Sequence, residues 1–190
     1  MARIIYITGG ARSGKSTCAE TLARQYADVT YIATSEARDD EMAARITHHQ
    51  ARRPAHWHTT EAPLDVVTAY QACDAQMSDD SACLLDCVTM WVTNQMFSRE
   101  IDWDTVDQPD IDAEETDIQN NARRLIEAVA AGRSDLIVVS NELGMGVVPA
   151  YRLGRIFRDI AGRVNQQFAQ AAHRAVLMVS GLPIELKKEV

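Results

Sequence analysis

A glycine-rich segment near the start of the chain has the residue types and spacing of a phosphate-binding loop. Residues 9–16 read Gly-Gly-Ala-Arg-Ser-Gly-Lys-Ser and fit the pattern G-x-x-x-x-G-K-[ST]. In such a loop the glycines let backbone N–H groups turn toward phosphate oxygens, and the next helix adds its positive N-terminus. Lys15 would reach the β- and γ-phosphates, and the Ser16 hydroxyl would bind Mg²⁺. The segment therefore predicts a nucleoside-triphosphate site.

A triphosphate site of this kind needs a second ligand for Mg²⁺, commonly a carboxylate at the end of another buried strand. Asp86 has that position, because it follows the apolar run at residues 82–85. The alternative role for Asp86 is as the N-cap of the helix that comes next. Glu142, after the apolar run at residues 136–140, is a weaker candidate for the same metal.

Two adjacent histidines lie in the basic stretch at residues 45–53. At helical spacing Arg45, His49 and Arg53 share one face, and His48 lies on a neighbouring face. A histidine can attack phosphorus and hold a covalent intermediate, and flanking guanidiniums favour its neutral, nucleophilic form. Spacing alone favours solvated histidines on a polar helix. A zinc site with the other nearby histidines fits no known ligand spacing.

The elements that must position these groups alternate along the chain. Strands are predicted at residues 3–8, 29–33, 56–60, 82–85, 136–140 and 175–180, and helices at 16–26, 37–53, 64–76, 89–97, 115–131 and 149–173. The last helix could break near Gly162. Continuous apolar strands alternating with helices predict an α/β fold with a mainly parallel sheet and helices on both faces. The length, 190 residues, predicts a single domain over residues 1–190.

The net charge of −8 comes from 27 acidic and 19 basic residues, and an acidic surface argues against a nucleic-acid partner. The excess is local. Eight acids and no base lie at residues 102–117, and outside that segment acids and bases balance at 19 each. Because Pro109 lies inside the segment, we predict an exposed acidic loop or lid there.

Four cysteines without a C-x-x-C pair favour reduced thiols over a disulfide framework or a zinc site. The apolar stretch at the N-terminus is short and interrupted by glycines, unlike a signal peptide. No run approaches the ~20 apolar residues that a membrane span needs. We therefore expect a cytoplasmic protein without a membrane span.

Several motifs together resemble the bifunctional adenosylcobinamide kinase/adenosylcobinamide-phosphate guanylyltransferase family. They are residues 8–16, 31–35, 40–46, 140–149 and 157–166, together with His49, Arg53, Pro54, Trp57 and Glu61. The resemblance runs from residue 4 to about residue 183 and leaves out roughly residues 98–115, which hold much of the acidic segment. It implies a P-loop NTPase fold related to the recombinase core, assembled as a homotrimer.

The resemblance also implies the reaction and its residues. Adenosylcobinamide is phosphorylated by GTP or ATP, and GMP is then transferred from GTP, with Mg²⁺, through a GMP-histidine. The family motif maps onto Arg45, Ile46, His49 and Arg53, which makes His49 the implied nucleophile and leaves His48 on a variable position. Lys15 is the other implied catalytic residue, and Ser16 and Asp86 would bind the metal. The implied nucleotide contacts are Gly9, Gly10, Ala11, Arg12, Ser13, Gly14, Lys15, Ser16, Thr34, Ser35, Glu36, Gln50, Ala51, Arg52, Arg53, Glu61 and Asp86.

Two other functions remain open from the residues alone. A plain P-loop kinase for a small molecule would transfer the γ-phosphate without a covalent intermediate. A nucleotide-dependent switch would hydrolyse the nucleotide slowly and transfer nothing to a small acceptor. Neither needs a nucleophile beside the arginines at residues 45 and 53.

Overall fold

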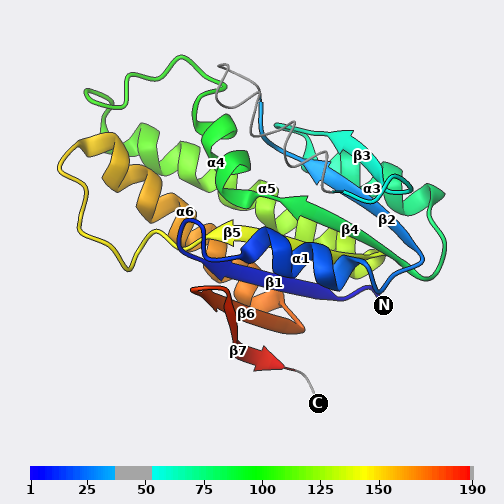
Figure 1. The fold of residues 1–190 in the computed structure, drawn as a ribbon. Coiled ribbons are helices and arrows are strands. Elements are labelled where there is room, and N and C mark those ends of the chain that lie inside the picture. The colour runs from blue at the N-terminus through cyan, green and yellow to red at the C-terminus, as the bar shows by residue number, and fades with distance from the viewer. Residues whose placement is uncertain (37–52, 189–190) are drawn as a thin grey trace.

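The computed structural model describes residues 1–36 and 53–188. In this part of the chain seven strands form one sheet in the order β3-β2-β4-β5-β1-β6-β7 (Figure 1). The strands are β1 (Ile4–Gly9), β2 (Asp28–Ala33), β3 (His58–Glu61), β4 (Ser81–Asp86), β5 (Asp135–Asn141), β6 (Arg174–Val179) and β7 (Leu182–Lys188). The described helices are α1 (Lys15–Ala23), α3 (Val66–Gln76), α4 (Val88–Met96), α5 (Gln108–Ala131) and α6 (Arg152–Ala171).

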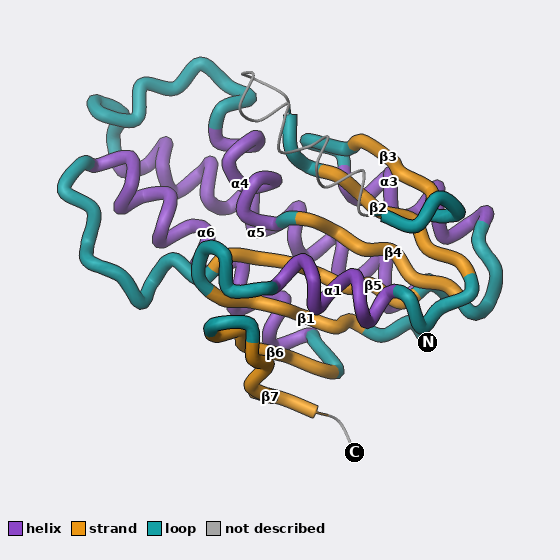
Figure 2. The backbone as a smooth tube through the Cα atoms, in the orientation of Figure 1, coloured by secondary structure: helices purple, strands orange, loops and turns teal. Residues whose placement is uncertain are grey.

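The sheet is parallel except at one edge, where β7 runs antiparallel to β6. The carboxyl ends of β1, β2, β3, β4 and β5 therefore lie side by side, along a line that crosses the strands. This line of strand ends is called the carboxyl edge of the sheet. The loop from β1 to α1, the turn from β6 to β7 and the loop from β5 to α6 lie at the same end of the molecule (Figure 2). The predicted α/β fold with a mainly parallel sheet is confirmed.

Alternate residues of the central strands face two separate hydrophobic clusters, as the period of a strand requires. In β5, Leu136 and Val138 face the cluster formed with α3, α4, α5 and α6. Ile137 and Val139 face a smaller cluster, which includes Ala19 of α1. Figure 1 shows α1 on the near face of the sheet, where its buried residues join this smaller cluster. Both faces are thus covered, and the apolar runs of β1, β4 and β5 follow from burial on both sides.

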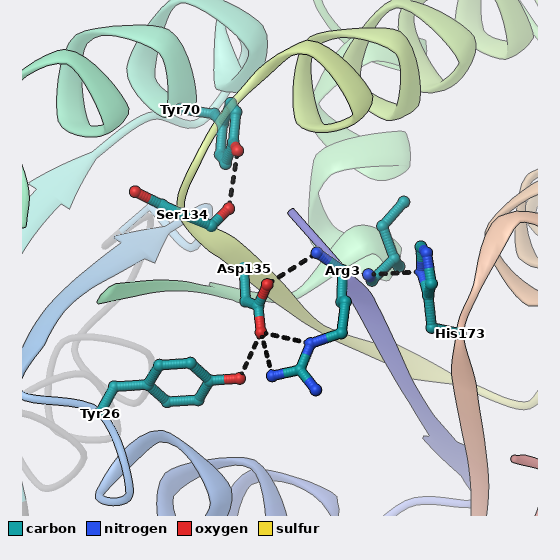
Figure 3. A network of polar contacts seen from close by, with 7 residues as sticks. Arg3, Tyr26, Tyr70, Ser134, Asp135 and His173 are labelled. Carbon is teal, nitrogen blue, oxygen red and sulfur yellow. Dashed lines mark hydrogen bonds and ion pairs between the residues drawn. The ribbon is translucent and has the colours of Figure 1, made fainter. Parts of the chain in front are cut away.

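At the amino ends of the strands, opposite the phosphate loop, a buried carboxylate ties three segments together (Figure 3). Asp135 is 7% exposed and accepts hydrogen bonds from the backbone and guanidinium of Arg3, at 2.7 to 3.0 Å. It also accepts one from the Tyr26 hydroxyl at 2.7 Å. Nearby, the Ile4 N–H donates to Nδ1 of His173 at 3.1 Å, which joins β1 to the start of β6.

Only the first part of the acidic segment is the predicted loop, because α5 begins at Gln108 and includes residues 108–117. Asp107 caps this helix by accepting from the N–H of Asp110, and Pro109 occupies the first turn, where its missing N–H costs nothing. Glu114 is 4% exposed and pairs with Arg99 at 2.8 Å. The prediction of a loop was therefore wrong for residues 108–114, because the helix predicted from residue 115 begins earlier, at Gln108.

Other element predictions need smaller corrections. Helix α6 continues without a break at Gly162. The strand β7 was not predicted; it follows a tight turn in which Ser180 and Gly181 have positive φ angles of 52° and 83°. The predicted helix at residues 37–53 lies outside the described residues, except for its last residue.

All four cysteines are free thiols, as predicted. Within residues 1–36 and 53–188, no helix is long and apolar enough to cross a membrane.

Candidate nucleotide site

The loop between β1 and α1 has a backbone that needs glycine at two positions. Gly9 has a φ of 151° and Gly14 has a φ of 96°, both in a region that side chains disfavour. A Cβ at Gly9 would lie 2.4 Å from the carbonyl oxygen of Met178 on β6. The loop thus passes so close to the neighbouring strand that only glycine fits there.

The C-terminal hairpin holds the other end of this loop. The N–H of Gly181, in the turn between β6 and β7, donates to the carbonyl of Ser13 at 3.0 Å. Inside the loop the N–H of Ser13 donates to the carbonyl of Gly10 at 3.3 Å. The shape of the phosphate loop therefore depends on residues near both ends of the chain.

The loop offers donors suited to a phosphate group. Helix α1 starts at Lys15 with no side-chain hydrogen bond at its N-cap, and the positive end of the helix dipole lies at the phosphate loop, where it favours an anion. Lys15 is 8% exposed, and its ammonium donates to the Gly10 carbonyl at 2.6 Å. Burial lowers the pKa of Lys15, while the charges of Cys87 and Asp86 oppose that shift. The buried hydroxyl of Ser13 has no hydrogen-bond partner in the described part of the chain. These features fit the predicted triphosphate.

Asp86 ends β4, two strands away from the phosphate loop, with β5 between them. Its Oδ2 accepts a hydrogen bond from the Tyr31 hydroxyl at 2.8 Å. The N-cap of α4 is Cys87, and no side chain caps that helix, so the alternative role of Asp86 as a cap is not observed. The carboxylate has a fixed orientation at the edge where a metal-bound triphosphate would lie.

Thr34, a predicted nucleotide contact, uses its hydroxyl inside the protein. The side chain is fully buried, and its Oγ1 donates to the carbonyl of Cys87 and accepts from the N–H of Cys87, both at 2.8 Å. The amide of Asn94 donates to the carbonyl of Thr34 at 2.7 Å and to that of Pro63 at 3.0 Å. These bonds clamp the chain directly after Asp86.

Arg53 is the first residue described after the gap, and it lies against β2 and β3. Its guanidinium carbon is 3.4 Å from the centre of the Tyr31 ring, and it donates to the Thr59 hydroxyl at 3.3 Å. Glu61 ends β3, where its register partner on β2 is Ala33. The predicted residues Arg45, Ile46, His48, His49, Gln50, Ala51 and Arg52 lie outside the described residues.

The remaining predicted contacts lie near the same edge of the sheet. Gly10, Ala11 and Arg12 form the exposed tip of the phosphate loop, and Ser16 is in the first turn of α1. Ser35 and Glu36 directly follow the buried end of β2 and are half-buried. The structure thus places the described members of the predicted nucleotide site near the carboxyl ends of the strands.

The end of β5 is linked to the start of α4 and to α6 by buried polar side chains. Ser140 donates to Oδ1 of Asn165 at 2.6 Å, and the amide of Asn165 donates to the Asn141 carbonyl at 3.0 Å. The N–H of Asn141 in turn donates to the Thr89 hydroxyl at 2.8 Å. The N–H of Glu142 donates to the Gly9 carbonyl at 2.9 Å, which extends this link to the phosphate loop.

Glu142 itself, the weaker metal candidate, turns away toward its own loop. Its Oε1 accepts hydrogen bonds from the N–H of Gly144 and, at 3.2 Å, from that of Met145. In residues 1–36 and 53–188 there is no group of three His, Cys, Asp or Glu side chains that could hold a metal ion.

Sequence reasoning gave no role to Tyr31, Thr89 or Asn94, although each makes contacts that hold the carboxyl ends of the strands in place. Their roles come from contacts between elements far apart in the chain, such as the hydrogen bond between Tyr31 and Asp86, which are 55 positions apart. A faint signal was present: polar residues at positions that the apolar pattern of a strand or helix makes buried must find a hydrogen-bond partner.

Comparison with known proteins points to one family. Residues 5–186 match the family model described as cobinamide kinase / cobinamide phosphate guanyltransferase. The chain is 47% identical, over 97% of its length and 99% of the relative's, to the bifunctional adenosylcobalamin biosynthesis protein CobU of Salmonella typhimurium. It is 40% identical to the bifunctional adenosylcobalamin biosynthesis protein CobP of Pseudomonas aeruginosa, over 96% of both chains.

Among solved structures, a KaiC-like protein of Pyrococcus horikoshii is similar over 92% of this chain and 70% of its own, with 10% identity and a TM-score of 0.48. The match to the family model covers nearly the whole chain, and two bifunctional relatives share close to half of its residues. The chain therefore belongs to the cobinamide kinase / cobinamide phosphate guanyltransferase family.

Proposed function

We propose that this protein phosphorylates adenosylcobinamide with a nucleoside triphosphate and then transfers GMP from GTP to that phosphate, giving adenosylcobinamide-GDP. The observation that carries the proposal is the pairing of a phosphate loop with a carboxylate, Asp86, held at the same edge of the sheet. Family membership supplies the acceptor, since the family is described by cobinamide and its phosphate.

In the kinase reaction, the loop N–H groups and Lys15 bind the triphosphate, and the charge that develops on the γ-phosphoryl group is stabilised by Lys15. Ser16 and Asp86 would hold Mg²⁺, which neutralises phosphate charge and orients the transferred group when bound. Asp86 suits this role because the Tyr31 hydroxyl already fixes one of its oxygens. The acceptor hydroxyl attacks the γ-phosphorus and gives up its proton to solvent, while the bond between the γ-phosphorus and the bridging oxygen breaks. The nucleoside diphosphate then leaves.

In the guanylyl reaction, the nitrogen of His49 attacks the α-phosphorus of GTP. A P–N bond forms, the bond between the α-phosphorus and the bridging oxygen breaks, and pyrophosphate leaves. The phosphate of the corrinoid then attacks the same phosphorus, the P–N bond breaks, and His49 is regenerated. Arg53, four residues after His49 in the sequence, is held at this edge by Tyr31 and Thr59, where its charge can stabilise the α-phosphate.

Labelling tests the covalent step directly. The protein is incubated with Mg²⁺ and GTP labelled at the α-phosphorus, without corrinoid. We expect acid-labile, alkali-stable label on the wild type and on His48→Ala, the matched control, and none on His49→Ala. Label that survives in His49→Ala and disappears in His48→Ala would make His48 the nucleophile.

A second assay separates the two other functions. With γ-labelled nucleotide and adenosylcobinamide, we expect label to move to the corrinoid. Transfer without any protein label from the α-position would indicate a plain kinase. Hydrolysis with no transfer to the corrinoid would indicate a nucleotide switch.

We also propose that the protein is a homotrimer, as the family resemblance implies. Two apolar surfaces support an assembly. On β7, an edge strand, the apolar side chains Leu182, Ile184 and Leu186 are 48 to 69% exposed. Met145, Val147 and Val148 are 60 to 96% exposed in the loop before α6. Light scattering after size exclusion measures the mass, and a 21.1 kDa species would refute the proposal.

A further inference from the structure

Tyr31 lies between two of the predicted site residues and contacts both. It is on β2, and its side chain is 3% exposed. Its hydroxyl donates to Oδ2 of Asp86 at 2.8 Å, and the Arg53 guanidinium stacks on its ring with a carbon-to-centre distance of 3.4 Å. One side chain thus contacts both the carboxylate proposed to bind the metal and the arginine proposed to face the α-phosphate.

The hydrogen bond to Asp86 is built into the sheet. Strands β2 and β4 pair in parallel, and the register places Ala33 of β2 opposite Asp86 of β4. Tyr31 lies two residues before Ala33 on β2, which puts its side chain within reach of Asp86. A tyrosine hydroxyl that faces a carboxylate donates to it, so this bond holds one oxygen of Asp86 and the other can face a metal ion.

The contact with Arg53 fixes a different group. An arginine over an aromatic face within about 6 Å is attracted by the ring quadrupole, and desolvation strengthens the attraction. Here the ring is buried, and the Thr59 hydroxyl holds the same guanidinium from β3 at 3.3 Å. The buried Nε of Arg53 has no hydrogen-bond partner in the described part of the chain.

We propose that Tyr31 is a positioning residue with two separable roles: its hydroxyl orients Asp86 for the metal, and its ring orients Arg53 for guanylyl transfer. This inference rests on the function proposed above, because that function gives Asp86 and Arg53 their roles. The first role serves both half-reactions. The second serves only the transfer of GMP.

Two substitutions separate these roles. Tyr31→Phe keeps the ring and removes the hydroxyl, and Tyr31→Leu removes both. Binding of GTP is measured by calorimetry over a series of Mg²⁺ concentrations, and formation of the covalent guanylyl adduct is timed at saturating Mg²⁺. A hydrogen bond to a charged group stabilises its partner more than a bond between neutral groups does. We therefore expect Tyr31→Phe to raise the Mg²⁺ concentration that gives half-maximal GTP binding by about 10-fold or more. Its labelling rate at saturating Mg²⁺ should stay within about 2-fold of the wild type.

Tyr31→Leu should show the same Mg²⁺ shift and also label about 10-fold more slowly at saturating Mg²⁺, in line with loss of a desolvated cation–π contact. Arg53→Gln should reproduce the slow labelling without the Mg²⁺ shift, which keeps this half testable if the leucine variant does not fold. Tyr26→Phe is the matched control. It removes a hydrogen bond of 2.7 Å to another buried carboxylate, Asp135, at the opposite end of the strands (Figure 3).

The outcomes are distinguishable. An unchanged Mg²⁺ midpoint in Tyr31→Phe overturns the first role, and so does an equal shift in Tyr26→Phe, which would make the effect one of stability. Equal labelling rates in Tyr31→Phe and Tyr31→Leu overturn the second role. If the wild type takes up no label at all, the guanylyl transfer proposed above fails, while the calorimetric test of Tyr31 and Asp86 still stands.

Discussion

Replacing Thr34 by valine distinguishes a structural role for its hydroxyl from a contact with nucleotide. Valine has nearly the same shape, so the substitution removes the hydroxyl and little else. In the structure this hydroxyl accepts from the N–H of Cys87 and donates to its carbonyl, both at 2.8 Å, in a fully buried position. The family resemblance instead implies that Thr34 contacts GTP.

The size of the effect follows from what each partner loses. The carbonyl of Cys87 keeps a second hydrogen bond, from the N–H of Trp91 at 3.1 Å. The N–H of Cys87 has no other described partner and becomes a buried unsatisfied donor, which costs about 1–3 kcal/mol. Adding about 1 kcal/mol for the second lost bond, we expect Thr34→Val to lower the free energy of unfolding by about 2–4 kcal/mol.

Urea unfolding followed by circular dichroism measures this change, and a fluorescent GTP analogue measures affinity at a temperature where both proteins are folded. Ser35→Ala, at the half-buried next position, is the control and should change stability by less than about 0.5 kcal/mol. A Thr34→Val protein with unchanged stability and GTP affinity reduced tenfold would refute the reasoning, because the hydroxyl would then act on the nucleotide.

Three further substitutions test other contacts. Gly9→Ala brings a Cβ within 2.4 Å of the Met178 carbonyl oxygen, so we expect the protein to lose about 3 kcal/mol in stability and to lose GTP binding. Thermal unfolding measures the first change and calorimetry the second. GTP binding at the wild-type affinity would contradict this expectation. Asn165→Ala removes two buried hydrogen bonds at the end of β5 and should cost about 2 kcal/mol in urea unfolding; a cost below about 0.5 kcal/mol would contradict the network. Burial alone would raise the pKa of Asp74, but hydrogen bonds from two N–H groups, that of Ser134 the shorter at 2.7 Å, lower it. Its stabilising effect is therefore present above the unfolded pKa of about 3.9 and is lost as the pH falls through the folded value, so Asp74→Asn should be less stable than the wild type at pH 7 and converge with it in acid.

Local patterns predicted the elements that carry the site. The apolar runs of β1, β4 and β5 are buried on both faces, and this burial is what makes a parallel strand visible in a sequence. The phosphate loop was recognisable because its glycines meet a local backbone requirement, seen in the φ angles of Gly9 and Gly14. Family resemblance supplied the reaction, which neither pattern nor spacing could give.

What local patterns missed depends on contacts between distant residues or on position within an element. Pro109 suggested a loop because proline breaks a helix interior, but it lies in the first turn of α5, where it is favoured. Glu114 looked exposed among other acids, yet it is buried because Arg99, outside the acidic run, pairs with it. Likewise, the buried roles of Thr34 and Tyr31 required knowledge of which strand lies beside β2.

The position of β1 between β5 and β6 has a consequence for how this protein acquires its shape during synthesis. The phosphate loop leaves the ribosome long before its supports, which are the end of β5, the carbonyl of Met178 and the N–H of Gly181. Pairing across such long sequence separations is slow, since the intervening chain must be ordered first. A nascent chain that stops before β6 would carry the full phosphate-loop sequence without its folded form, so nucleotide binding should appear only after β6 and the turn that follows it have been synthesised.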